Sequence, residues 1–281
     1  SRFSLLTGLM PARHGAHPNH SQVKPGTKFL PPILKKMGYH IASFGKIAHG
    51  NKKFEGLDFN EPKRTDMCVE VEKYFKNNKM DGPICLLVGD RRPHVEWTKE
   101  MNFDPKKVTL PSFFIDTQET REHWARYLTD IEGMDQEMGR VLKFAKKKFG
   151  DNFIFMFTSD HGGQWPFGKW NLYDYGTRVP LQVRWPGKIK AGVRTDAMVS
   201  WVDLAPTILQ FANVLDDKGK LTPSTEKSLG IAKIKGEQNG RALAPGKFHG
   251  RSFLSVLDQV KTSGWDQVNA SHTFHEITMY Y

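Results

Sequence analysis

The sequence FIFMFTSDHGG, residues 153–163, decides the fold class expected for this chain. Its first five residues are apolar and match a strand in length, and a polar loop rich in Gly follows at once. The same order, a short apolar run and then a polar loop, recurs at residues 40–50 and 84–94. Continuous apolar runs of this length are typical of strands buried on both faces of a parallel sheet. A further strand is expected at residues 180–185.

Helical patterns lie between these strands, which favours an α/β fold with helices covering a mostly parallel sheet. Residues 117–149 repeat apolar side chains every third or fourth position, as an amphipathic helix requires. We expect Asp116 and Glu119 to form a capping box at its start. Shorter helices are expected at residues 28–37, with two prolines in the first turn, and at residues 201–213.

The amino-acid composition indicates what kind of protein this is and what kind of partner it binds. The 281 residues include 41 Lys and Arg against 30 Asp and Glu, a formal net charge of +11. With 38% hydrophobic and 25% charged residues, the chain is globular in composition, and the charge favours an anionic partner or a merely solvated basic surface. No run of five Lys or Arg occurs, so a nucleic acid is not the expected partner. No apolar run approaches about 18 residues, so no membrane-spanning helix is expected. Cys68 and Cys85 could form one disulfide bridge, but two buried free thiols are expected.

Charged and imidazole side chains gather in the loops that follow the predicted strands. Ligands of an open parallel sheet bind beyond the carboxyl ends of its strands, so we expect these side chains to share one site. A further loop, just before residues 180–185, adds two cations. Such a set suits a multiply charged oxyanion together with a metal ion. The candidates are Lys46 and His49 after the first strand, His94 after the second, Asp160 and His161 after the third, and Lys169 and Arg178 in the further loop.

Each candidate also has a purely structural explanation. Asp160 and His161 can offer a metal ion a carboxylate oxygen and an imidazole nitrogen, but the Asp can equally cap local backbone amides. Lys46 can bind an anionic oxygen and His49 can pass a proton to a leaving group, although two exposed polar residues give the same pattern. The aromatic residues around Lys169 either exclude water from its ammonium group or are simply exposed.

The ordered set of motifs resembles the sulfatase family. SRFSLLTG at residues 1–8 resembles the end of the sulfatase signature, Cys/Ser-x-Pro-Ser-Arg-x-x-Leu-x-Thr-Gly. The Gly-Lys and His-Gly pairs within residues 45–50 resemble the second signature, and TSDHG at residues 158–162 resembles the family's metal segment. GKWNLYDYGTR, with its Lys nine residues before its Arg, and VDLAPT at residues 202–207 complete the order.

The resemblance implies an alkaline-phosphatase-like α/β sandwich that binds one Ca²⁺. It also implies a formylglycine, made from the signature Cys or Ser, whose hydrate attacks sulfur. The residues implied are Arg2 beside the formylglycine, Lys46 and Lys169 on sulfate oxygens, Arg178 in substrate binding, His49 and His94 in substrate binding and leaving-group protonation, and Asp160 and His161 on calcium. The nearest branches are the iduronate-2-sulfatase-like and heparan N-sulfatase-like members, so the implied substrate is a sulfated saccharide derived from glycosaminoglycans.

The signature's nucleophile position would lie three residues before Ser1, and the family's first metal-binding Asp pair further upstream. We therefore expect a chain truncated at both ends and inactive by itself, with the sulfatase catalytic domain at residues 1–262 and the start of a C-terminal subdomain at residues 263–281. A formylglycine-generating or equivalent maturation enzyme is the expected protein partner, and export to the periplasm, the lysosome or the extracellular space is expected. Two alternatives are a phosphodiesterase or phosphonate hydrolase of the same superfamily and a non-catalytic binder of sulfated glycans.

Overall fold

The computed structural model describes residues 2–17, 21–47, 55–62, 66–223, 225 and 248–257. His49 and the subdomain expected at residues 263–281 lie outside these residues, so both remain predictions. The helices are α1 (Arg2–Thr7), α2 (Pro11–His14), α3 (Leu30–Lys36), α4 (Met67–Asn77), α5 (Gln118–Phe149), α6 (Asp174–Thr177), α7 (Trp201–Phe211) and the 3₁₀ turn η1 (Leu254–Val256). The strands are β1 (His40–Gly45), β2 (Phe59–Glu61), β3 (Ile84–Gly89), β4 (Phe155–Thr158) and β5 (Leu181–Arg184).

The strands form a parallel sheet and an antiparallel pair. β1 lies between β2 and β3 and runs parallel to both, with Phe44 opposite Glu61 on one side and Val88 on the other. β4 pairs with β5 in the antiparallel sense, with Phe155 opposite Arg184. The expected α/β architecture is therefore confirmed, and its central sheet is parallel. The strand expected at residues 180–185 is present as β5, but it forms an antiparallel pair.

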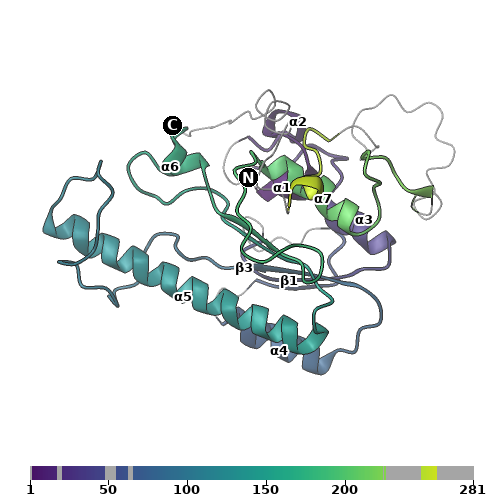
Figure 1. Cartoon of the computed structure of the whole chain (residues 1–281), viewed down its shortest axis with the longest axis horizontal. Coiled ribbons are helices and arrows are strands. Elements are labelled where there is room, and N and C mark those ends of the chain that lie inside the picture. Colours follow the sequence, from purple (N-terminus) through teal and green to yellow (C-terminus); the bar gives the residue numbers. More distant parts are fainter. Residues whose placement is uncertain are drawn as a thin grey trace.

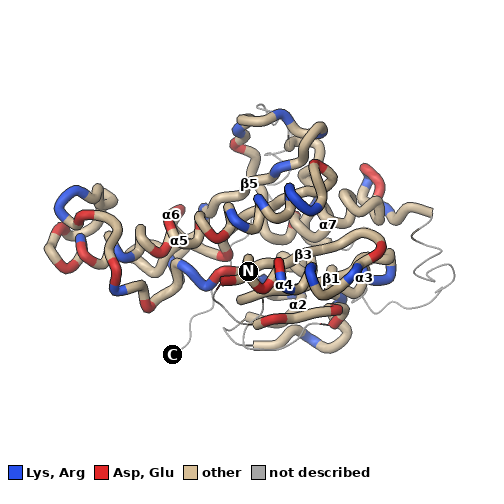
Figure 2. Tube along the Cα trace, turned by 90° about the horizontal axis from the view of Figure 1, so that it is seen from below, with Lys and Arg blue, Asp and Glu red and all other residues tan. Residues whose placement is uncertain are grey.

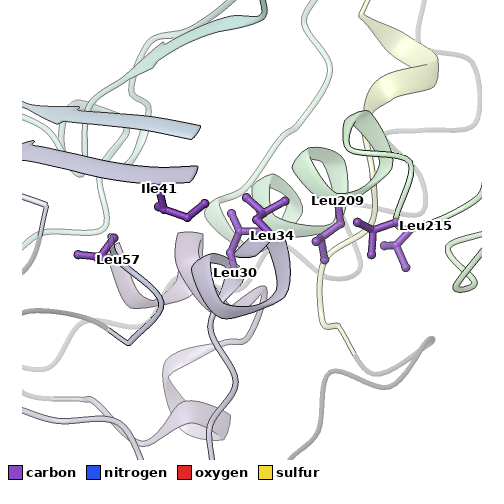
Figure 3. Packing of buried hydrophobic residues seen from close by; sticks show 7 residues of the cluster. Leu30, Leu34, Ile41, Leu57, Leu209 and Leu215 are labelled. Atoms are coloured by element: carbon purple, nitrogen blue, oxygen red, sulfur yellow. The ribbon is translucent and has the colours of Figure 1, made fainter. Parts of the chain in front are cut away.

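Helices cover the parallel sheet on both faces (Figure 1). Ala42 and Phe44 of β1 pack against Val71, Tyr74 and Phe75 of α4, and the long helix α5 lies along α4. Ile41 points to the opposite face, where it joins leucines of α3 and α7, as Figure 3 shows. Because successive side chains of a strand point to opposite faces, β1 is buried on both sides, as its apolar sequence predicts.

Burial on both faces does not extend to the other long strands. Every residue of β3 and of β4 is only half-buried. β3 is the outer strand of the three-stranded sheet, and β4 belongs to a two-stranded pair. The apolar runs therefore predicted the positions of β3 and β4 correctly, but the prediction that both strands are buried on both faces is wrong.

The predicted capping box of α5 is wrong. The N-cap is Thr117, whose hydroxyl accepts a hydrogen bond from the Thr120 amide at 3.2 Å. Asp116 instead forms a two-bond ion pair with the guanidinium of Arg121, at 2.5 and 2.7 Å. The hydroxyl one residue closer to the helix reaches the free amide, and the carboxylate finds a stronger partner in the guanidinium.

The net positive charge is spread over the described elements. Figure 2 shows Lys and Arg interspersed with Asp and Glu along α5 and the segments around it. Three lysines occupy the last turn of α5, where they complement the negative end of the helix dipole. No described helix is long and apolar enough to cross a membrane. Both cysteines are free thiols, as expected.

Candidate active site

The loops that follow β1 and β3 are joined backbone to backbone. Gly45, the last residue of β1, has a φ of +73°, and a Cβ there would collide with the carbonyl oxygen of Gly89 at the end of β3. The Lys46 amide donates to the same carbonyl oxygen at 2.7 Å. Glycine is therefore required at this position, and it brings Lys46 beside the loop that carries His94.

The loop after β4 is held against α6 in a similar way. The Gly162 amide donates to the Gly176 carbonyl at 2.9 Å, and a Cβ on Gly162 would overlap the Tyr175 carbonyl oxygen. The Lys169 amide donates to the Gly163 carbonyl at 2.8 Å. These contacts fix the Asp160-His161 pair next to the segment that carries Lys169.

Helix α1 contributes Arg2 to the site. One guanidinium nitrogen, Nη1, lies 3.9 Å from the Asp160 carboxylate and donates to the Lys46 carbonyl at 3.4 Å. The side chain of Arg2 is 18% exposed, and that of Asp160 is 35% exposed, so water screens this pair only in part. Arg2 therefore links the loop after β1 to the loop after β4.

A buried pair inside the N-terminal segment supports α1. His14 Nδ1 accepts a hydrogen bond from the Ala16 amide at 3.1 Å, so Nε2 carries the ring proton and faces Ser4 Oγ at 3.2 Å. Burial, with a smaller contribution from positive Lys24, lowers the pKa of His14 to about 4. His14 is thus a neutral, structural residue. Its sequence context carried no strand or metal spacing that could have indicated this role.

The charges around Asp160 place several of the predicted residues in one electrostatic cluster. Burial pushes the pKa of the Asp160 carboxyl upward, but His161, Arg2 and Lys46 outweigh it and lower that pKa. Burial also lowers the pKa of Lys169, which the Asp160 carboxylate opposes and Arg2 reinforces. The geometry behind this cluster is the Arg2 guanidinium, which lies 3.9 Å from the Asp160 carboxylate and 3.4 Å from the Lys46 carbonyl.

His94 belongs to the same cluster. Its Nδ1 donates to the Val95 carbonyl, so Nε2 is the nitrogen left for a ligand. That hydrogen bond raises the pKa of His94, but burial and the positive charges of Lys46, Lys169 and Arg91 outweigh it and lower the pKa overall. The imidazole is therefore neutral near pH 7.

Asp160 and His161 fit part of a metal site. His161 Nδ1 donates to the Gly162 carbonyl at 2.8 Å, which leaves the Nε2 lone pair 3.5 Å from Asp160 Oδ1. Burial lowers the pKa of His161 against the pull of Asp160, so two electron-rich atoms face each other and a cation between them would be stabilised. Among the described residues, no group of three or more His, Cys, Asp or Glu could hold a metal ion.

Aromatic side chains pack together around Trp165, four residues before Lys169. Trp165 stacks on Trp97 with ring centroids 4.6 Å apart, and it also contacts Phe114, Trp124 and Tyr127. Two of the neighbouring rings, Phe167 and Trp170, are exposed.

The structure thus brings together six of the predicted residues. The six that interact are Arg2, Lys46, His94, Asp160, His161 and Lys169. Arg178 is exposed, and within the described ranges its side chain makes no hydrogen bond or ion pair with them. His49 lies outside the described residues.

Comparison with known proteins decides the family. The sulfatase family model matches residues 1–214. The chain belongs to the sulfatase family. It is 28% identical over 230 residues to an ulvan-active sulfatase of Formosa agariphila, covering 75% of this chain and 44% of that protein. It is 27% identical over 325 residues to the human N-sulphoglucosamine sulphohydrolase, covering the whole chain and 60% of that protein. The chain therefore spans less than two-thirds of the length of these sulfatases.

Likeness to solved structures supports the alkaline-phosphatase-like fold. One of them, determined in complex with its substrate D-glucosamine-2-N,6-O-disulfate, superposes with a TM-score of 0.66 at 19% identity. The match covers 94% of this chain and 71% of that one. The predicted fold class is confirmed by this likeness and by the parallel sheet with its helices.

The family-like VDLAPT motif has a structural role in this member of the sulfatase family. The buried carboxylate of Asp203 accepts hydrogen bonds from the amides of Ser200 and Arg251, at 2.8 and 2.9 Å. Thr207 Oγ1 donates to the Asp203 carbonyl at 2.7 Å and accepts from the Phe253 amide at 3.0 Å. The motif therefore ties the segment at residues 248–257 to α7, which in turn packs on α1. The sequence of the motif indicated the family, but it did not predict the contact with residues 248–257.

Proposed function

We propose that the intact protein hydrolyses the sulfuric esters or sulfamates of sugars, with glycosaminoglycan-derived saccharides as substrates. The observation that carries the proposal is the convergence of Lys46 and Lys169 on the Arg2–Asp160 pair in a member of the sulfatase family. Three cations around one carboxylate leave positive charge in excess, and that excess favours a bound SO₃ group. The names of two relatives, an ulvan-active sulfatase and an N-sulphoglucosamine sulphohydrolase, support a sulfated saccharide as the substrate class.

In this proposal Lys46 and Lys169 hold the non-bridging sulfate oxygens. Their ammonium groups would neutralise the negative charge that repels a nucleophile, and burial around Lys169 strengthens its field. Arg2, anchored by the Lys46 carbonyl and Asp160, would orient the groups that precede α1. These residues bind and position the sulfate.

The protonation of His94 would depend on the charge around it. The positive Lys46 and Lys169 help to keep its pKa low, and a bound sulfate would offset them. Its Nε2 would then take up a proton and pass it to the leaving oxygen or nitrogen as the bond to sulfur breaks. His49 shares this role in the proposal.

Asp160 and His161 would hold the divalent cation, for which we propose Ca²⁺. The carboxylate is the kind of ligand that Ca²⁺ prefers, and further oxygen ligands would complete its coordination. Bound there, the ion would add positive charge at the sulfate, and a formylglycine hydrate would supply the nucleophile. The proposal includes a maturation enzyme that makes the formylglycine, and export of the protein.

Turnover by the intact protein tests the proposed function. Lys169→Ala should lower turnover of a sulfated saccharide about 10²-fold or more, because it removes one oxyanion partner. Lys107→Ala is the matched control, since the Lys107 side chain is 85% exposed and lies outside the cluster. Wild-type kinetics in Lys169→Ala would remove that residue from the site.

A substrate panel separates the alternatives. Heparin and chondroitin oligosaccharides, an aryl sulfate, a phosphodiester and a phosphonate monoester would be compared. Preferred turnover of the phosphorus substrates would establish the phosphoryl-transfer alternative, and saccharide binding without turnover would establish the glycan binder. In the same preparations, Asp160→Ala should lower the calcium content found by elemental analysis. Unchanged calcium would refute the metal assignment.

A further inference from the structure

The loop that carries Lys169 exposes an unusual amount of apolar surface. Nine large hydrophobic residues are exposed in the described part of the chain, and four of them lie between residues 167 and 173. They are Phe167, Trp170, Leu172 and Tyr173, with exposed fractions of 42%, 56%, 57% and 59%. Apolar residues gathered in this way beside a polar site commonly mark a binding surface.

The backbone of this loop holds two of the aromatic residues in an unfavourable conformation. Phe167 has a φ of +60° and Trp170 a φ of +71°, in the left-handed region that bulky side chains seldom adopt. Neighbouring amides fix the loop, because Gly168 donates to the Trp165 carbonyl at 2.9 Å and Asn171 donates to the Gly168 carbonyl at 3.0 Å. Strain of this kind persists where the surroundings enforce it, and it is concentrated at functional sites.

Trp170 borders the anion site directly. The Lys169 ammonium lies 5.1 Å from the centroid of the Trp170 ring, within the range of a cation–π contact. The same ammonium interacts with Asp160 and Arg2 in the charged cluster. The exposed ring therefore stands at the edge of the position where Lys169 would hold a sulfate oxygen.

A sugar ring is the ligand that fits this juxtaposition. A sulfate ester or sulfamate joins its sugar through a single atom, so the ring must lie beside the sulfate. Sugar rings present an apolar face of C–H groups as well as polar hydroxyls, and an indole offers a large flat apolar surface with little conformational freedom to lose. Positive charge on one side and an aromatic plane on the other match a sulfate and the ring that carries it.

We propose that Trp170 is a saccharide-binding residue on which the ring of the sulfated sugar stacks while Lys169 holds its sulfate. This inference rests on the proposed function, since it takes the sulfated saccharide from there. It adds a determinant of specificity for the sugar, as distinct from the sulfate.

Binding measurements on the intact protein test this role. Isothermal titration calorimetry would compare an N-sulfated heparin disaccharide with inorganic sulfate. Trp170→Ala should weaken disaccharide binding about tenfold, which corresponds to about 1.4 kcal/mol and to roughly 60 Å² of buried apolar surface. Trp170→Phe, which retains a ring, should recover most of that affinity. Inorganic sulfate should bind Trp170→Ala within about twofold of wild type, since it has no ring to stack. Val69→Ala is the matched control and should bind both probes as wild type does, because Val69 is 50% exposed and lies on α4, outside this loop.

Each result decides the matter. Equal weakening of sulfate and disaccharide in Trp170→Ala would mean that Trp170 acts only through Lys169, and unchanged disaccharide affinity would mean that it does not act at all. Either result overturns the inference and leaves the proposed function standing. Loss of disaccharide affinity with no turnover of sulfated sugars by the wild type would refute the proposed function but support the stacking role. A wild-type protein that neither binds nor turns over any sulfated saccharide of the panel would refute both.

Discussion

Asp203→Asn is the substitution whose effect on stability follows most directly from the structure. The carboxylate is 3% exposed and accepts two backbone hydrogen bonds, from Ser200 and from Arg251, which lies 48 residues further along the chain. An asparagine can offer its oxygen to only one of these amides and must turn its NH₂ group toward the other. One bond to a charged acceptor is lost, and one backbone donor remains without its partner.

The magnitude comes from these two bonds. A hydrogen bond to a charged group contributes about 1.5–3 kcal/mol, and an unpaired buried donor costs about 1–3 kcal/mol. The two quantities overlap, and both amides belong to half-buried residues that water can partly reach. We therefore expect Asp203→Asn to lower the free energy of unfolding by about 2–3 kcal/mol and Asp203→Ala by somewhat more.

Urea denaturation of the chain, followed by far-ultraviolet circular dichroism and by tryptophan fluorescence, measures this change. Asp151→Asn is the control, because the Asp151 side chain is 66% exposed and its pair with Arg184 spans 3.3 Å. That substitution should cost less than about 1 kcal/mol. An Asp203→Asn protein within about 0.5 kcal/mol of wild type would refute the argument that this carboxylate holds residues 248–257 to α7.

Three further predictions concern stability. The pKa of His14 is about 4 in the folded chain against 6.5 for a free side chain, so the unfolded state binds more protons between these values and stability falls as the pH drops. At pH 5 this residue alone should cost about 2 kcal/mol relative to pH 7.5, and His14→Gln should flatten the pH dependence of urea denaturation. Gly162→Ala places a Cβ on the Tyr175 carbonyl oxygen and should lower the free energy of unfolding by about 1–3 kcal/mol. Gly139→Ala, whose Cβ would meet nothing within 4 Å, should raise it by about 0.5–1 kcal/mol. Equal effects of the two substitutions in urea denaturation would exclude the steric reason. Glu137 is 1% exposed and accepts a hydrogen bond from the Cys68 amide at 2.6 Å. Glu137→Ala should therefore lower the free energy of unfolding by about 2–4 kcal/mol, and Glu137→Gln, which keeps an acceptor, by less than half of that. Equal losses of the two variants in thermal or urea unfolding would mean that the hydrogen bond to α4 does not stabilise the fold.

The sequence alone could predict most of the elements and much of the candidate site. Short apolar runs identified β1, β3, β4 and β5, and a repeat of three or four residues identified α5, because both signals depend only on neighbouring residues. Lys46 and His94 were accessible to the same reasoning, since each follows a strand of the parallel sheet and the ends of parallel strands lie at one edge of a sheet. Asp160 was predicted in the same way, but it follows β4, which belongs to the antiparallel pair. The family could also be recognised, because the order of several weak motifs is specific even when each motif is not.

Other features were decided only by the tertiary structure, because they depend on contacts between residues far apart in the sequence. The antiparallel pairing of β4 with β5, the contact of Asp203 with the Arg251 amide and the link from Arg2 to Asp160 join segments that no local pattern connects. The cap of α5 depended on competition between Asp116 and Thr117, which Arg121 settled by binding the carboxylate. The exposure of Trp170 beside the Lys169 ammonium came from the backbone path between Gly163 and Gly176, where close packing leaves no room for a Cβ at Gly168 or Gly176. Local sequence specifies which groups are available, but packing of the backbone decides which of them face each other.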